Sequence, residues 1–204
     1  RLRLMGPKDA LVVCGDFGFL WNGGPEERET LEWIGRRRYP VLFLEGTHDN
    51  LELLNSYPVE EWNGGLTHHI CGNLRHLIRG QIFTIQGKTL LAVGGGESRD
   101  MLFRKAGQSW WPGELPGYDE LDGWFARLDA AGGGVDYIAS HQAPTNIDSC
   151  ITGKVCEVTA LTAFMDRLQQ RYRFTRWYFG AYHQDRVVPP KYHALFERVE
   201  QAPA

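Results

Sequence analysis

The chain has 204 residues, of which 43% are hydrophobic and 23% are charged, and its formal net charge is −3. This length and composition indicate a single globular domain with a core large enough to fold without disulfides or structural metals, and they exclude a disordered or fibrous chain. The near balance of charges provides no basic field for nucleic acid, and no apolar run reaches the roughly 18 residues of a membrane span.

The cysteines and the first residue bear on processing and location. The four cysteines show no CxxC spacing and no signal peptide is visible, so we expect free thiols and a cytoplasmic protein. The chain begins at Arg1 without Met and soon enters a strand pattern. We therefore expect a truncated or processed product whose first strand precedes Arg1.

The first part of the chain has the pattern of a βαβ unit. Strands are predicted over 10–16 and 39–46, and a helix over 25–37 lies between them. Pro25 opens this helix and acidic residues fill its first turn, where they complement the helix dipole. Residues 81–95 predict two strands joined by a tight turn, which makes the sheet system mixed.

Residues 94–117 form a long segment without clean periodicity. It starts with three glycines and carries Trp110 and Trp111. Loops of this length in compact domains are usually functional or mobile, so we expect a lid over a cleft. The alternative is that the two tryptophans anchor the loop to the core.

The rest of the chain again alternates between helix and strand. Helices are predicted over 118–131 and 158–171, and strands over 135–141 and 173–180. The whole pattern favours one α/β domain over residues 1–204.

Four predicted strands end in turns that carry Asp or His. Asp16 follows the first, His48 and Asp49 follow the second, His141 ends the third, and His183 follows the fourth. Ligands of α/β sheets bind at the carboxyl ends of strands, and carboxylates with imidazoles suit Mn, Fe or Zn. One such residue is most often an ordinary turn residue, but four turns together predict a metal site.

The order of these motifs resembles the calcineurin-like metallophosphoesterases over about residues 10–186. Along the chain the motifs occur in the order GD, GxHD, a strand-end His and GxxH. The segments VVCGDFGFLWNG, YPVEEWNGG, SWWPGELP and WYFGAYHQDR resemble a bacterial branch of this family.

The resemblance implies a fold and an activity. The implied fold is a four-layer α/β/β/α sandwich of two mixed sheets flanked by helices. We expect the strands over 10–16, 39–46, 135–141 and 173–180 to lie side by side with their carboxyl ends on one rim. The implied activity is hydrolysis of phosphate mono- or diesters by water that two divalent ions (Mn, Fe or Zn) activate.

The resemblance also implies roles for single residues. Asp16 matches the carboxylate that bridges the two metals, and His141 and His183 match further metal ligands. Thr47 stands at the position of an amide-oxygen ligand. His48 matches the catalytic histidine beside the leaving group.

Several positions depart from the family pattern. Thr47 replaces Asn, Ala181 replaces the first His of GHxH, and Phe19 replaces an Asp that supports the catalytic histidine in many members. The family's Asp-x-His turn is expected before Arg1. The departures leave an alternative function, a catalytically silent scaffold that binds a partner through the strand-end cleft or the tryptophan-rich loop. The substrate is expected to be a phosphate ester of unknown identity.

Overall fold

The first five strands form one sheet of the computed structural model, which describes residues 2–98 and 100–203. Their order across this sheet is β1-β2-β5-β4-β3, with β1, β2 and β5 parallel and β3 and β4 antiparallel. The strands are β1 (Leu11–Val13), β2 (Val41–Phe43), β3 (Val59–Trp62), β4 (Gly65–Cys71) and β5 (Leu74–Leu77).

The remaining six strands form the second sheet. Their order is β10-β11-β9-β8-β7-β6, with a parallel centre and antiparallel strands at both edges. The strands are β6 (Ile82–Ile85), β7 (Lys88–Val93), β8 (Tyr137–Ser140), β9 (Arg176–Phe179), β10 (Arg186–Val188) and β11 (Tyr192–Ala194). Both sheets are therefore mixed, as predicted.

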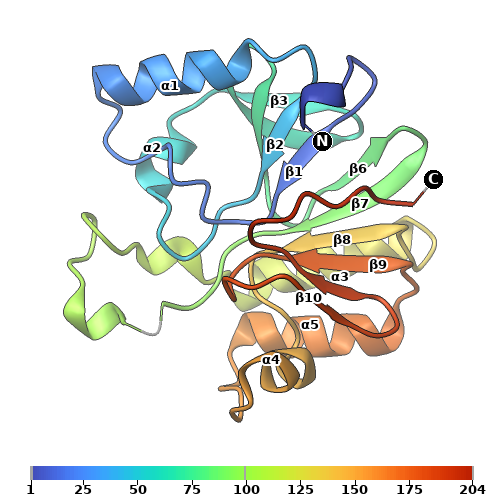
Figure 1. Cartoon of the computed structure of the whole chain (residues 1–204). Helices are drawn as coiled ribbons and strands as arrows, with labels where there is room; N and C mark the ends of the chain where they lie inside the picture. Colours follow the sequence, from blue (N-terminus) through green and yellow to red (C-terminus); the bar gives the residue numbers. More distant parts are fainter. Residues whose placement is uncertain (1, 99, 204) are drawn as a thin grey trace.

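Helices cover the outer face of each sheet (Figure 1). The first sheet carries α1 (Pro25–Gly35) and the short α2 (Leu51–Asn55). The second sheet carries α3 (Tyr118–Ala130), α4 (Thr145–Thr152) and α5 (Ala160–Arg171). No helix within the described residues is both long and apolar enough to cross a lipid bilayer.

Three apolar clusters show how the layers pack. One cluster contains Leu42 and Leu77 from the first sheet together with Leu90 and Tyr178 from the second, so the two sheets pack face to face. The other two clusters join each sheet to its own helices. This arrangement confirms the four-layer sandwich that the sequence predicts.

One expectation about the strands is wrong. The four strands that carry Asp or His at their ends do not lie side by side in one row: β1 pairs with β2 in the first sheet, and β8 pairs with β9 in the second. The reason is the hairpin of β6 and β7, which carries the chain into the second sheet and makes β7 the neighbour of β8.

Candidate functional site at the strand ends

Asp16 lies in the turn after β1 and is held against the turn after β2. Its Oδ1 atom accepts a hydrogen bond of 3.1 Å from the backbone N–H of Thr47. A Cβ added to Gly46 would overlap the same oxygen, so only glycine lets the two turns approach this closely. Asp16 has a positive φ of 48°, a conformation that Asp adopts more readily than most residues.

His141 brings the second sheet to the same point. It follows β8 and is only 2% exposed, and its Nε2 lies 3.6 Å from Asp16 Oδ1. Its Nδ1 lies 3.4 Å from the carbonyl oxygen of Cys14, and a side chain at Gly15 would overlap the ring. Burial lowers the pKa of His141 and the charge of Asp16 offsets this only in part, so the neutral ring is favoured.

The segment over 94–117 is tied to the turn after β2 by a buried polar cluster. The Oγ of Ser98 lies 3.0 Å from the carbonyl oxygen of Thr47 and 2.9 Å from Glu114 Oε2. Glu114 Oε1 accepts a hydrogen bond of 2.6 Å from the N–H of Ser98. Burial raises the pKa of Glu114, and the hydrogen bonds from Ser98 offset part of that effect. The cluster fixes the segment beside His48.

His48 has an arginine neighbour. Its Nε2 lies 3.4 Å from Arg104 Nη2, and this guanidinium also pairs with Asp100 at 2.7 Å and donates to the carbonyl oxygen of Ser109. The Nδ1 of His48 is buried and has no hydrogen-bond partner among the described residues. Among the described residues no carboxylate therefore supports this ring, which agrees with Phe19 at the position where the resemblance implies an Asp.

The described contacts of His183 are with Phe196. Its side chain is exposed and its ring stacks on Phe196 with the centroids 5.2 Å apart. Instead of a side chain from this turn, the backbone N–H groups of Gly180 and Ala181 reach the site and donate to the carbonyl oxygen of His141. The contacts of the described residues include none between His183 and Asp16 or His141.

The described donor set does not fit a two-metal centre. Among the described residues, no group of three or more His, Cys, Asp or Glu is arranged to hold a metal ion. Asp16 and His141 supply one carboxylate and one imidazole, Thr47 supplies only a neutral hydroxyl, and Ala181 supplies no donor. A divalent ion needs more strong ligands than this set provides.

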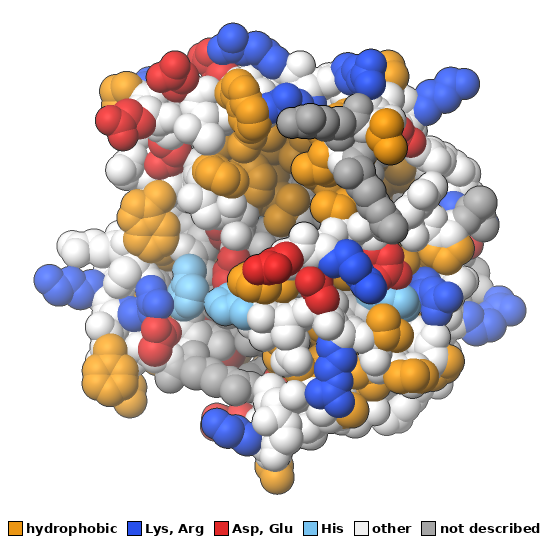
Figure 2. Space-filling model, in the orientation of Figure 1, with side chains coloured by type: hydrophobic (Ala, Val, Ile, Leu, Met, Phe, Trp, Pro, Cys, Tyr) orange, Lys and Arg blue, Asp and Glu red, His pale blue; other side chains and the backbone are white. Residues whose placement is uncertain are grey.

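The site thus contains both predicted and unpredicted residues. Asp16, Thr47 and His141 meet where the sheets join, and His48 follows Thr47 directly. Figure 2 shows His side chains beside acidic and basic ones on one face of the molecule. Arg104 and Glu114 were not predicted. Both belong to the non-periodic segment 94–117, whose only sequence signals are its glycines and tryptophans.

Comparison with known proteins supplies one match. The family model for calcineurin-like phosphoesterases matches residues 2–185, which is most of the chain. The search of curated proteins finds no match.

Proposed function

The chain belongs to the calcineurin-like phosphoesterase family, and from this premise we propose that its strand-end site binds and hydrolyses a phosphate mono- or diester. One observation carries the proposal. Asp16 accepts a hydrogen bond from Thr47 in the first sheet and lies 3.6 Å from His141 of the second. A single carboxylate thereby joins the chemically active turns of both sheets.

Two residues of this chain are assigned to the ester itself. The Arg104 guanidinium is fixed by Asp100 and Ser109, and guanidinium groups bind phosphoryl oxygens with good geometry. His48 lies within 3.4 Å of this guanidinium and is assigned to the leaving oxygen, whose developing charge it would stabilise. Neither role requires a metal ligand.

Metal binding by the chain is expected to be weak. Asp16, Thr47, His141 and His183 remain the positions that we propose for contact with divalent ions such as Mn, Fe or Zn. The described residues do not form a metal-binding group. We therefore expect this polypeptide to hydrolyse esters slowly.

Hydrolysis of simple esters tests the proposal. 4-Nitrophenyl phosphate and bis(4-nitrophenyl) phosphate would be offered with Mn²⁺ to the unaltered chain and to the double variant Thr47→Asn/Ala181→His. We expect little turnover by the unaltered chain and an increase of roughly two orders of magnitude or more in the double variant. Ala131→His, on an exposed residue after α3, is the control for adding an imidazole elsewhere.

The outcome separates the two functions considered for this fold. If the double variant binds metal and still hydrolyses no ester from a broad panel, the proposed function is refuted and the scaffold alternative is supported.

The location of the protein in the cell is a separate proposal. Cys14, Cys71 and Cys150 are free thiols, which agrees with the reducing cytoplasm that we propose for this protein.

A further inference from the structure

Two neighbouring apolar side chains of the segment 94–117 are almost completely exposed. Leu102 is 91% exposed and Phe103 is 92% exposed, and Met101 before them is also exposed. The three residues form the short helix η2 (Met101–Phe103), which is the apolar tip of this segment. Single exposed apolar residues are common on protein surfaces, but large neighbours without cover form a hydrophobic patch, and such patches mark interaction sites.

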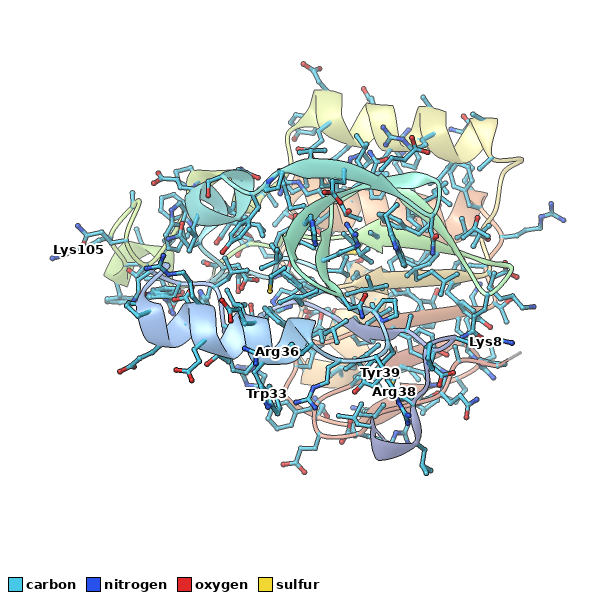
Figure 3. All side chains as sticks on the ribbon, turned by 90° about the horizontal axis from the view of Figure 1, so that it is seen from above. Lys8, Trp33, Arg36, Arg38, Tyr39 and Lys105 are labelled. Atoms are coloured by element: carbon cyan, nitrogen blue, oxygen red, sulfur yellow. The ribbon has the colours of Figure 1, made fainter. Side chains whose placement is uncertain are left out.

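The apolar tip lies at the outer end of the segment, away from both sheets. In Figure 1 the segment (yellow-green) extends beyond the sheets and carries η2 far from them. Figure 3 shows Lys105, two residues after the tip, at the same outer end and pointing away from the sheets. The rest of the described chain therefore leaves Leu102 and Phe103 uncovered.

Hydrogen bonds hold the base of the tip in place. The N–H of Phe103 donates to the carbonyl oxygen of Asp100 at 2.9 Å. The next N–H, that of Arg104, donates to the carbonyl oxygen of Met101 at 3.1 Å. The Arg104 guanidinium pairs with Asp100 at 2.7 Å and donates to the carbonyl oxygen of Ser109. Because the base is already ordered, little conformational freedom is lost when a partner covers the tip.

The charge beside the tip is positive. Lys105 is exposed, and the described residues give it no ion pair. Asp100, the acidic residue nearest to the tip along the chain, is neutralised by its pairing with Arg104. A cation next to exposed apolar side chains matches a surface of anionic lipids, because apolar side chains enter the acyl boundary while cations stay among the headgroups.

The small area of the tip favours a lipid surface over a protein partner. Three side chains expose a few hundred Å² at most, whereas each partner of a stable protein–protein interface buries roughly 800 Å². A second copy of this chain would therefore find too little area on the tip for a stable dimer. Acyl chains need no shaped counterpart, since the hydrophobic effect is not directional.

The tip adjoins the strand-end site. Arg104 follows Phe103 directly, and its Nη2 lies 3.4 Å from His48 Nε2. The loop after β1 adds the exposed Trp21, whose ring meets Trp111 of the segment with the centroids 5.5 Å apart. Exposed apolar side chains thus flank the groups that are assigned to the ester.

We propose that the apolar tip docks this chain on an anionic lipid surface. Leu102 and Phe103 enter the acyl boundary, and Lys105 contacts the headgroups. Docking of this kind needs no membrane-spanning helix, no metal and no turnover, so it goes beyond ester hydrolysis. It would bring Arg104 and His48 close to the phosphate groups of the surface, and this consequence alone rests on the proposed function.

Co-sedimentation with lipid vesicles tests the proposal. The unaltered chain would be mixed with vesicles of phosphatidylcholine alone and with vesicles that contain equal parts of phosphatidylcholine and phosphatidylglycerol. We expect tighter binding to the mixed vesicles. Leu102→Ser/Phe103→Ser should weaken that binding at least about tenfold, because the apolar area that enters the lipid is lost. Lys105→Gln should weaken it by about 3- to 5-fold and reduce the preference for phosphatidylglycerol.

Val155→Ser/Val158→Ser is the matched control. Both valines are exposed in the loop between α4 and α5, so this variant removes an apolar pair elsewhere on the surface. It should bind the vesicles like the unaltered chain, and all variants should melt at similar temperatures because the removed side chains are exposed.

Three results would overturn the proposal. The first is that the unaltered chain does not bind the mixed vesicles. The second is that Leu102→Ser/Phe103→Ser binds them as well as the control does. The third is a dimer of the unaltered chain in light scattering that is lost in Leu102→Ser/Phe103→Ser, because the tip would then be a protein interface.

Discussion

Gly46 is the residue on which the contact between the two turns depends. An added Cβ would overlap the Asp16 carboxylate and the backbone nitrogen of Asp16, and neither can move without breaking the hydrogen bond to Thr47. We expect Gly46→Ala to lower the free energy of unfolding by about 1–3 kcal/mol in urea denaturation.

Gly123 provides the control for that measurement. It lies in the exposed middle of α3, with nothing within 4 Å of an added Cβ. Gly123→Ala should raise the free energy of unfolding by roughly 0.5–1 kcal/mol, because alanine favours the helix. Equal effects of the two substitutions would show that the turns do not need a close approach at Gly46.

His48 is assigned to the leaving group rather than to a metal. In the Thr47→Asn/Ala181→His background, His48→Ala should lower kcat by roughly 10²–10⁴ and leave the metal content unchanged. Steady-state kinetics and elemental analysis of the same preparation check both parts. Loss of bound metal on this substitution would make His48 a ligand and contradict the assignment.

Protonation of His68 should lower the free energy of unfolding in mild acid. Burial lowers its pKa to about 4 in the folded chain, so the unfolded chain binds the proton more readily between about pH 6.5 and 4. The contribution of His68 to stability is fully present above pH 6.5 and is lost as the pH falls toward 4, with a total of about 3 kcal/mol.

Urea denaturation over this pH range measures the effect of His68. In His68→Gln the stability should fall less steeply between pH 6.5 and 4, because the ring that must be charged is absent. If the free energy of unfolding depends on pH identically in the two proteins, the lowered pKa of His68 is refuted.

At the residue scale, the side chains that lie directly at the ends of strands could be predicted from the sequence. Asp16 and His141 were expected together because each ends a buried strand, and they lie 3.6 Å apart. The orientation of His183 is set by its turn, with φ of 49°, and by stacking on Phe196, and neither is visible in motif spacing. Arg104 reaches His48 from a loop, where no periodicity predicts side-chain direction.

At the scale of elements, the segment 94–117 has one tryptophan that packs as an anchor. Trp111 is 4% exposed and contacts Trp21, which lies in the loop before α1. Trp111→Ala should therefore lower the melting temperature strongly, as expected for about 3 kcal/mol of lost packing. Trp110, which is less buried, should have a smaller effect.

The same two variants test the lid that the sequence suggests. If the segment works as a lid, their kinetics in the active double variant should show a raised KM. A raised KM with an unchanged melting temperature for Trp111→Ala would contradict the anchoring role.

Elements with a clear apolar pattern were predicted well, and those without one were not. The helix expected over 25–37 is α1, and the hairpin expected over 81–95 is β6 and β7. The strands β3 and β4 were not predicted because β3 is largely exposed and β4 carries several polar residues, so no apolar run marks them. Antiparallel pairing of β4 with β3 and with β5 holds these strands in place, and the parallel pairing of β5 with β2 joins them to the rest of the sheet.

At the scale of the whole molecule, the site exists because two sheets pack face to face. The turns after β1 and β2 come from one sheet and the turn after β8 comes from the other, and Asp16 lies between them. The family resemblance predicted the sandwich, but the strand pattern alone did not reveal that the four active turns divide between sheets. That division follows from the hairpin of β6 and β7, because the second partner of β7 is β8, which is distant in sequence.

Metal stoichiometry tests the central claim most directly, namely that this is a phosphoesterase site whose metal binding is limited by Thr47 and Ala181. Bound Mn²⁺ per chain would be measured by elemental analysis after equilibrium dialysis, for the unaltered chain, for Thr47→Asn/Ala181→His, and for the double variant that also carries Asp16→Asn. We predict well below one ion per chain in the first, about one in the second, and loss of that ion in the third. Two tightly bound ions in the unaltered chain, or no gain in the double variant, would contradict the account.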